Sequence, residues 1–306
     1  MATVIIRANG LGRSPRLLSR IREWLHSPPS PAPVVQAARA PEPAPRPAAV
    51  ATGNESLAEV LSPSQVNCFL ECSAKWYFRY FVGLPEVKAA NLALGRAIHH
   101  VAAVHFSEIL NKRAGFTREL AIAEFERAWD GEAADTVFSA DESPDDLKRM
   151  GAVLTGKFIT EAAAEIKPAA VEQRVEGVIG GVKVKGYVDL LDTDGCVIDL
   201  KTAAKKPSGI KPGYKLQLAT YRQITPGASG AAQLITLTKT KTPQLVRTKY
   251  TVTAADVAMC EKLYPLAQEG MRSGLYYPNR ESMMCSRGCC SYWAQCEREF
   301  GGAVED

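Results

Sequence analysis

The spacing of apolar positions changes near Val171 and divides the chain into a helical part and a mixed part. Before that point, apolar residues recur three and four positions apart, which is typical of helices that pack on a core. Beyond it, short runs rich in Val and Ile are bounded by Gly-Gly and Asp-Gly, as strands are. The predicted helices cover 63–83, 92–112, 117–132, 143–166, 212–224 and 253–274, and the predicted strands cover 171–180, 182–192, 196–202, 231–240 and 244–253.

Polar residues at three of the predicted helix starts can accept hydrogen bonds from the free N–H groups of the first turn. Ser62 precedes a proline at the first helical position, and Gln65 stands where it completes a capping box. Ser143 caps the fourth helix in the same way, and Thr253 with Asp256 forms another capping box. These signals indicate helix starts at 63, 144 and 254.

The order of elements predicts the fold class. Helices come first, a three-stranded antiparallel meander follows, and a helix, two strands and a last helix complete the chain. This order favours one α/β domain over 56–306, with a mixed β-sheet flanked by helices, and excludes a doubly wound nucleotide-binding fold. The sequence contains no glycine-rich phosphate loop, so nucleotide hydrolysis is set aside.

The charge of the chain is concentrated in its first 50 residues. They hold seven Arg and two Glu, a net +5, while the remainder of the chain holds 30 basic and 31 acidic residues, a net −1. Residues 1–55 are therefore predicted to be a disordered basic tail that is rich in Pro and Ala over 27–50. An amphipathic helix over 14–27 that acts as an organellar transit peptide is the alternative. Any nucleic-acid surface on the body must be a local patch.

Two acids interrupt apolar runs in the predicted hairpin, and this points to metal chemistry. A three-residue loop over 193–195 would place Asp189 opposite Asp199, with Lys201 on the same face as Asp199. Carboxylates about 5 Å apart repel each other, and Mg²⁺ or Mn²⁺ between them would remove the conflict. An exposed strand face with an ordinary Asp–Lys pair stays open at this point. A two-residue turn would shift the register by one.

Four motifs in order resemble the RecB-like branch of the PD-(D/E)XK nucleases. Asp189 followed ten positions later by Asp199-Leu200-Lys201 is similar to the branch's active site, and Glu172 stands where many members have an acid. Gln217-x-x-x-Tyr221 resembles the branch's accessory helix motif, and Gly95-x-x-x-His99 resembles its histidine motif. The resemblance implies a restriction-endonuclease-like core. It also implies Mg²⁺ or Mn²⁺ ligands, which are His99, Asp189, Asp199 and the Leu200 carbonyl.

The cysteines extend the resemblance to members that carry an iron–sulfur staple, such as the AddB-like, CRISPR-associated and eukaryotic exonuclease types. One Cys near the start of the body and three near its end match that arrangement, which implies a [4Fe–4S] cluster joining the N-terminal helices to the C-terminal segment. Four thiolates also suit zinc. Cys289 could replace Cys290, and Cys68 could replace Cys72, while Cys196 and Cys260 are expected in the core. The expected cluster ligands are Cys72, Cys285, Cys290 and Cys296.

The resemblance implies a Mg²⁺- or Mn²⁺-dependent DNA exonuclease, acting on single-stranded DNA or DNA ends in recombination, repair or replication. A CRISPR adaptation nuclease within an integrase complex and a non-catalytic DNA-binding subunit are the alternatives. Expected partners are DNA and a helicase, recombination or integrase protein. No apolar run is long enough for a membrane span, and a cytoplasmic location in a bacterium or phage-infected cell is expected. The aromatic run 76–80 is expected in the core, with base stacking as the alternative.

Overall fold

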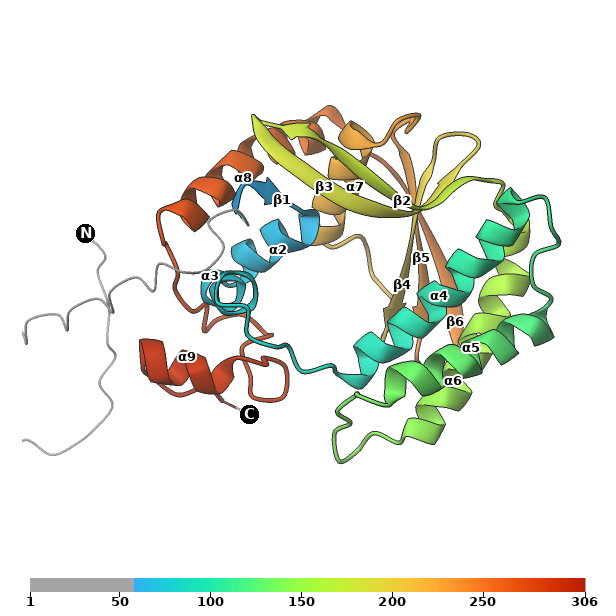
Figure 1. Cartoon of the computed structure of the whole chain (residues 1–306), viewed down its shortest axis with the longest axis horizontal. Coiled ribbons are helices and arrows are strands. Elements are labelled where there is room, and N and C mark those ends of the chain that lie inside the picture. The colour runs from blue at the N-terminus through green and yellow to red at the C-terminus, as the bar shows by residue number, and fades with distance from the viewer. Residues whose placement is uncertain (1–57, 306) are drawn as a thin grey trace, which may run out of the picture. The chain divides into compact units, whose positions relative to one another are not determined.

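The computed structural model describes residues 58–305, and these form a mixed sheet with helices on both faces (Figure 1). The predicted tail, with its basic helix or transit peptide, lies outside the described residues. None of the helices within 58–305 is both long and apolar enough to cross a membrane.

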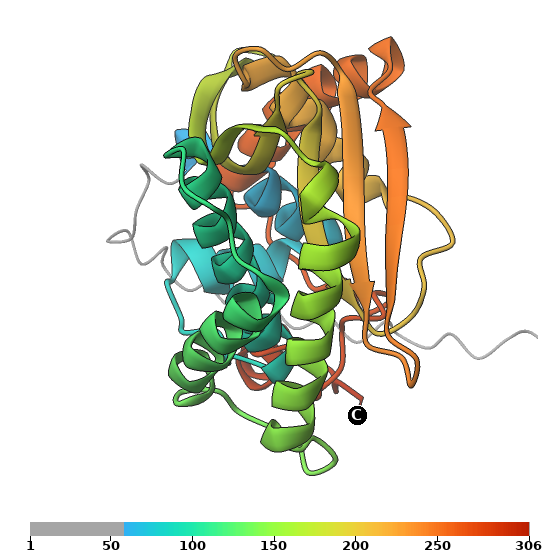
Figure 2. The same ribbon diagram turned by 90° about the vertical axis from the view of Figure 1, so that its right-hand side faces the viewer.

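The sheet has six strands in the order β1-β3-β4-β5-β6, and β2 pairs with the other edge of β3. The pairs β2–β3 and β3–β4 are antiparallel, as the meander predicted. The pair β5–β6 is also antiparallel, and β1–β3 and β4–β5 are parallel. Figure 2 shows β5 and β6 as a long adjacent pair. The strands are β1 (Val60–Leu61), β2 (Pro168–Ile179), β3 (Val182–Asp192), β4 (Val197–Ala203), β5 (Ala231–Thr238) and β6 (Gln244–Thr251).

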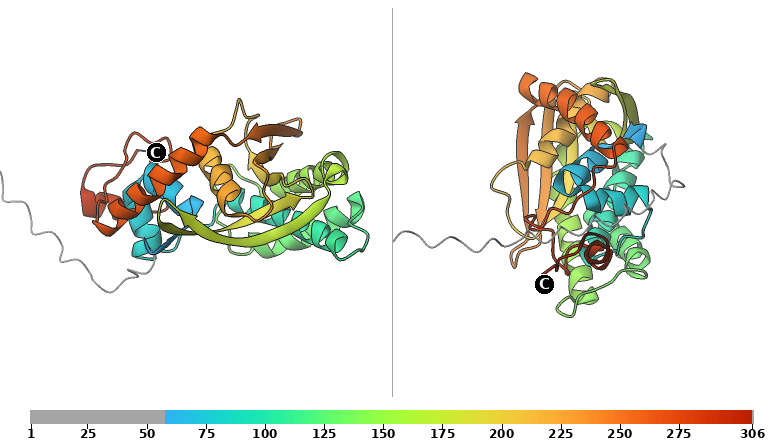
Figure 3. Two further views of the ribbon diagram at one scale, coloured as in Figure 1. Left: turned by 90° about the horizontal axis from the view of Figure 1, so that it is seen from above. Right: turned by 90° about the vertical axis from the view of Figure 1, so that its left-hand side faces the viewer.

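The helices bury their apolar faces in two separate cores, one on each side of the sheet. The first core lies under α2, α7 and α8 and includes Val184, Val188 and Tyr264, and the second lies under α4, α5 and α6 and includes Phe106 and Leu200. Figure 3 shows α7 and α8 along one side of the curved β2–β3 pair. The longer helices are α2 (Pro63–Glu71), α4 (Ala90–Leu110), α5 (Arg118–Ala133), α6 (Pro144–Glu161), α7 (Pro212–Ile224), α8 (Ala254–Arg272) and α9 (Trp293–Phe300).

The hairpin between β3 and β4 has the predicted three-residue loop and register. The Asp192 N–H donates to the Cys196 carbonyl at 3.1 Å, and the Asp192 carboxylate accepts from the N–H groups of Asp194 and Cys196 at 2.9 and 2.8 Å. Gly195 has φ 76°, a left-handed conformation in which a residue with a Cβ is disfavoured. The loop therefore fixes the register, and the paired ladder runs through Leu190–Ile198.

The predicted helix starts are confirmed, but the first helix is shorter than predicted. Ser62, Ser143 and Thr253 each accept a first-turn N–H, and the Thr253–Asp256 capping box is complete. The chain then leaves the helical conformation at Cys72, which has φ −160° and ψ 106°. It continues as the short α3 (Ser73–Trp76) and a π-helical turn, η2 (Tyr77–Phe81). Hydrogen bonds from the C-terminal segment hold this break, and the local sequence pattern does not show them. The pattern also missed β1 and α9.

Candidate functional site

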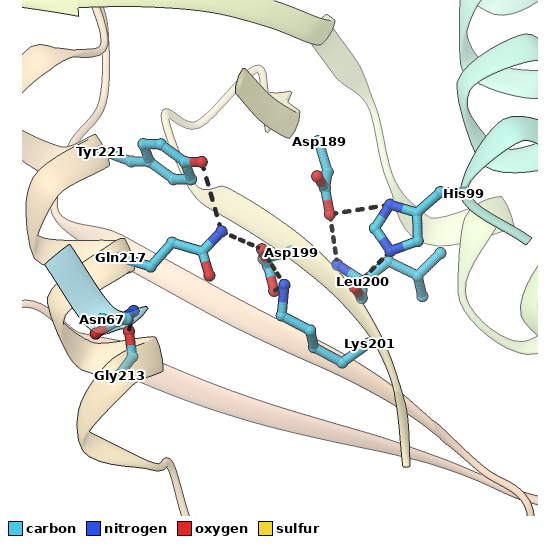
Figure 4. Close-up of polar contacts among 9 residues, drawn as sticks. All are labelled: Asn67, His99, Asp189, Asp199, Leu200, Lys201, Gly213, Gln217 and Tyr221. Atoms are coloured by element: carbon cyan, nitrogen blue, oxygen red, sulfur yellow. Dashed lines mark hydrogen bonds and ion pairs between the residues drawn. The ribbon is translucent and has the colours of Figure 1, made fainter. Parts of the chain in front are cut away.

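Asp189 and Asp199 lie just beyond the last paired residues of the β3–β4 ladder, where the two strands separate. The Asp189 carboxylate accepts the Leu200 N–H at 2.9 Å and faces α4. The Asp199 carboxylate faces α7 instead (Figure 4). The two acids are thus neighbours on adjacent strands, as the register predicted, but they bind different groups. Tyr187 does not pair with Lys201, because the β3–β4 ladder ends at Leu190–Ile198.

His99 of α4 points into the site and presents a bare nitrogen to Asp189. Its Nε2 lies 2.8 Å from the Leu200 carbonyl oxygen, which can only accept, so Nε2 carries the hydrogen. In the neutral ring, Nδ1 is then an acceptor, and it lies 3.5 Å from Oδ2 of Asp189. Two acceptors facing each other are the arrangement that a cation between them stabilises. A metal-binding His commonly donates its other N–H to a backbone carbonyl in this way.

Glu172 of β2 completes a group of three metal-ligand side chains. One ligand atom from each of His99, Glu172 and Asp189 lies within 4.8 Å of the other two. Glu172 has φ 45°, which is unusual for a residue with a side chain and is typical of strained positions at functional sites. The residue as a whole is exposed, but partial burial of its carboxylate and the nearby charge of Asp189 raise its pKa. The donor set of one imidazole and two carboxylates fits Mg²⁺ or Mn²⁺.

Asp199 forms the second half of the site with Lys201 and Gln217. Lys201 Nζ lies 2.8 and 2.7 Å from the two carboxylate oxygens of Asp199, and Gln217 Nε2 donates to Oδ1 at 3.1 Å. Gln217 Nε2 also lies 3.4 Å from the Tyr221 hydroxyl. Since Asp199 is only 2% exposed, burial raises its pKa to about 6, the charge of Asp189 adds to the rise, and Lys201 opposes it.

The ammonium of Lys201 stays charged because of these acids. Burial alone lowers the pKa of Lys201, but the charges of Asp199 and Asp189 outweigh burial and raise it overall. Burial also raises the pKa of the Tyr221 phenol, which keeps its hydrogen available for donation. The site therefore combines a cation-binding group on one side with a fixed ammonium and two neutral donors on the other.

The geometry agrees with the comparison to protein families. Residues 60–297 match the model of the PD-(D/E)XK nuclease superfamily. The chain belongs to this superfamily. The match spans every candidate residue from Cys72 to Cys296.

Comparison of this PD-(D/E)XK chain with curated proteins finds no match. Among solved structures, it is similar to a Eubacterium rectale protein named "Putative exonuclease", with a TM-score of 0.49, 13% identity and coverage of 77% of this chain and 88% of that chain. The structure named SSO0001 is similar with a TM-score of 0.35, 16% identity and coverage of 67% and 98%. With both TM-scores below 0.5, the assignment to the superfamily depends on the family match.

Four cysteines of the PD-(D/E)XK domain surround one cavity beside the break in the first helix. Asn279 holds this region together, since its N–H donates to Cys72 Sγ at 3.4 Å and its side chain to the Glu71 carbonyl at 2.8 Å. Cys289 is exposed and does not line the cavity, and buried Cys68 does not line it either. The cysteines that line it are Cys72, Cys285, Cys290 and Cys296.

The cavity thiols influence one another without being close enough for a single ion. Burial raises the pKa of Cys296 to about 11, and Cys72, Cys290 and Cys285 add to the rise. Within residues 58–305, no three of these thiols lie within 4.8 Å of one another. Zinc holds its sulfurs at about 2.3 Å and so at most about 4.6 Å apart. The four thiols therefore share a cavity but do not form a ready-made metal-binding group, for zinc or for the predicted cluster.

The aromatic run 76–80 and two further cysteines lie away from the metal-ligand group, and Gly95 does not require a glycine. Trp76 and Phe78 are buried and pack on other aromatic rings, so the run 76–80 belongs to the core, as expected. Cys260 is also buried, and Cys196 is half-buried. A Cβ on Gly95 would meet Thr202 Oγ1 at 3.6 Å, which is ordinary contact, so the packing does not require a glycine at this position of the Gly95-x-x-x-His99 motif.

Asn67 of α2 is a site-supporting residue that the sequence did not indicate. Its Nδ2 donates to the Gly213 carbonyl at 3.0 Å, and a Cβ on Gly213 would meet Asn67 Oδ1 at 3.2 Å (Figure 4). The bond ties α2 to the first turn of α7, the helix that carries Gln217 and Tyr221. Because the two partners are 146 positions apart, no local pattern could have shown the contact.

Proposed function

We propose that this chain is a Mg²⁺- or Mn²⁺-dependent DNA exonuclease that hydrolyses phosphodiester bonds in recombination, repair or replication. The observation that carries the proposal is the bare Nδ1 of His99 facing the Asp189 carboxylate beside the buried Asp199–Lys201 pair. The superfamily match supports nuclease chemistry. The choice of DNA as substrate follows the sequence resemblance, and a cytoplasmic location remains part of the proposal.

In this proposal each residue has a distinct task. His99, Asp189 and Glu172 would hold the metal, with Asp199 as the further ligand that the resemblance implies. When bound, the metal would activate a water and neutralise charge on the phosphate. The Leu200 carbonyl, expected as a ligand, accepts the His99 Nε2–H and so orients the ring, and its second lone pair is available to the metal. Lys201 stabilises negative charge on the scissile phosphate. Gln217 donates to Asp199 and to the Tyr221 hydroxyl, and the Tyr221 O–H donates to the DNA strand.

The decisive experiment is digestion of end-labelled DNA by the anaerobically purified full chain. Single-stranded and duplex substrates of one sequence are compared with Mn²⁺, with Mg²⁺ and with a chelator, and each DNA end is blocked in turn. Metal-dependent release of nucleotides from one end supports the proposal. Absence of cleavage on all substrates with either metal would reject it.

We further propose that the four cavity cysteines hold a [4Fe–4S] cluster. The support is that these four line one cavity, with one from the helix break and three from the C-terminal segment, the arrangement that the sequence resemblance implies. In this role the cluster joins the helix break at Cys72 to the C-terminal segment and thereby fixes one end of α2.

The two neighbouring histidines provide a matched test of the metal site. His99→Ala should lower cleavage by about a hundredfold and raise the Mn²⁺ concentration needed, because it removes Nδ1 and the bond to Leu200. His100→Ala should stay within about twofold of the unmodified protein, since His100 lies at the surface and bonds only Glu124, at 2.7 Å. Cleavage rates against Mn²⁺ concentration check both, and an inactive His100→Ala would contradict the assignment.

A further inference from the structure

The outer face of the β2–β3 pair continues from the metal-ligand group as an open strip. Along β3, successive side chains point to opposite faces of the sheet, so residues two positions apart share a face. Val182, Val184, Gly186 and Val188 are buried against the α7–α8 side. The alternate positions are exposed until the strand reaches half-buried Asp189, and they are Lys183, Lys185 and Tyr187.

The strip is basic and lies in line with the site. At about 3.4 Å per residue, Tyr187 lies about 7 Å from Asp189 along the strand, and Lys185 and Lys183 follow at about 14 and 20 Å. Across from them on β2, Arg174 pairs with Tyr187 and Glu176 with Lys185 in the ladder. Glu176 forms its ion pair with Arg174, and within residues 58–305 neither lysine forms a salt bridge. Three cations and one acid give the strip a net charge of +2.

Tyr187 is the aromatic residue of this strip and is available to a ligand. Its exposed fraction is 56%, and within residues 58–305 it forms no hydrogen bond and no ring contact with another side chain. The aromatic run 76–80, by contrast, packs on Tyr276 and on the C-terminal helix. An exposed ring next to unpaired cations is the combination by which proteins hold single-stranded nucleic acid without reading its sequence.

We propose that Tyr187, Lys185 and Lys183 form a binding strip for single-stranded DNA that leads to the metal-ligand group. Tyr187 stacks on a base next to the phosphate that is cut, and the two lysines neutralise the following phosphates. This inference rests on the proposed nuclease function and extends it to a substrate class. A duplex keeps its bases stacked inside, so the strip favours single strands.

The test measures binding separately from cleavage. The full chain is titrated into a fluorescent single-stranded oligonucleotide and into the matching duplex, with a chelator present to prevent cutting. Tyr187→Ala should weaken single-strand binding about tenfold and duplex binding little, and Tyr187→Phe should retain it. Tyr277→Ala is the matched control, because Tyr277 is 58% exposed but lies at the cysteine region.

The lysines are tested by salt dependence. Lys183→Gln and Lys185→Gln should each lower the slope of log affinity against log salt concentration by about 0.7, the value for one phosphate contact on a single strand. Lys262→Gln is the control, since this exposed lysine belongs to α8 on the other side of the sheet. Equal slopes for all three variants would overturn the lysine contacts.

The result also separates the two proposals. If the unmodified protein cuts DNA but Tyr187→Ala binds single strands as Tyr277→Ala does, the strip is wrong and the nuclease function stands. If the unmodified protein neither cuts nor binds DNA, the proposed function itself fails. Thermal unfolding of each variant shows whether a loss of binding comes from a loss of fold.

Discussion

Asp199→Asn should abolish DNA cleavage, lowering the rate by at least about a hundredfold, while the chain stays folded. The substitution preserves the shape of a 2% exposed side chain and an oxygen that can accept from Gln217. It removes the negative charge that pairs with Lys201 at 2.7 Å, next to the strand that carries Asp189. Rates with saturating Mn²⁺ and thermal unfolding curves are the measurements.

Two companion variants sharpen this test. Lys201→Met should be equally inactive, since it removes the ammonium and leaves Asp199 buried without its cation. Lys201→Met should lower the free energy of unfolding by about 3 kcal/mol, because it leaves a buried carboxylate without its cation. Asp199→Asn should lower it less, because burial already disfavours the charged form of Asp199. Asp194→Asn is the control, because Asp194 is an exposed acid in the same hairpin. An Asp199→Asn variant that cuts at the normal rate would reject the active-site assignment.

Cys72→Ala should remove the brown colour of anaerobically purified protein and destabilise the fold strongly. The proposed cluster accounts for about four irons per chain, with broad visible absorption. Cys72 and Cys285 are 213 positions apart in the sequence, and closing so long a loop can contribute up to about 5 kcal/mol by the chain-entropy estimate for crosslinks. Iron content, absorption and denaturant unfolding are the measurements.

The adjacent cysteines supply the control for this experiment. Cys290→Ala should behave as Cys72→Ala does, because both thiols line the cavity. Cys289→Ala should keep the colour and the stability, since Cys289 is exposed and lies outside the cavity. A colourless protein with one tightly held zinc would contradict the cluster.

A cluster at this position would act on the nuclease site through α2. The helix ends at the cavity, where Asn279 holds Glu71 and Cys72, and its middle carries Asn67, which holds Gly213 at the start of α7. Gln217 follows one turn later and contacts Asp199. These contacts connect the cavity to Asp199 through α2 and α7. Loss of the cluster should therefore also lower the cleavage rate of the protein that remains folded.

The sequence by itself determined the features that depend on neighbouring residues. Helix starts at Ser62, Ser143 and Thr253 follow from side chains that bond N–H groups three positions away. The β3–β4 register follows from a loop closed by Asp192 and Gly195, and this register places Asp189 beside Asp199. The period of apolar residues separates helices from strands for the same reason, since each element's pitch is local.

Only the tertiary structure decided what depends on distant contacts. The turn of the His99 ring toward Asp189 needs the Leu200 carbonyl from another element, and the break at Cys72 needs Asn279. Two aromatic side chains differ in burial. Trp76 is buried and packs on Tyr276 of the C-terminal segment, whereas Tyr187 is exposed. Burial is set by the whole packing arrangement, so a local pattern could indicate which residues carry chemistry but could not say which of them meet.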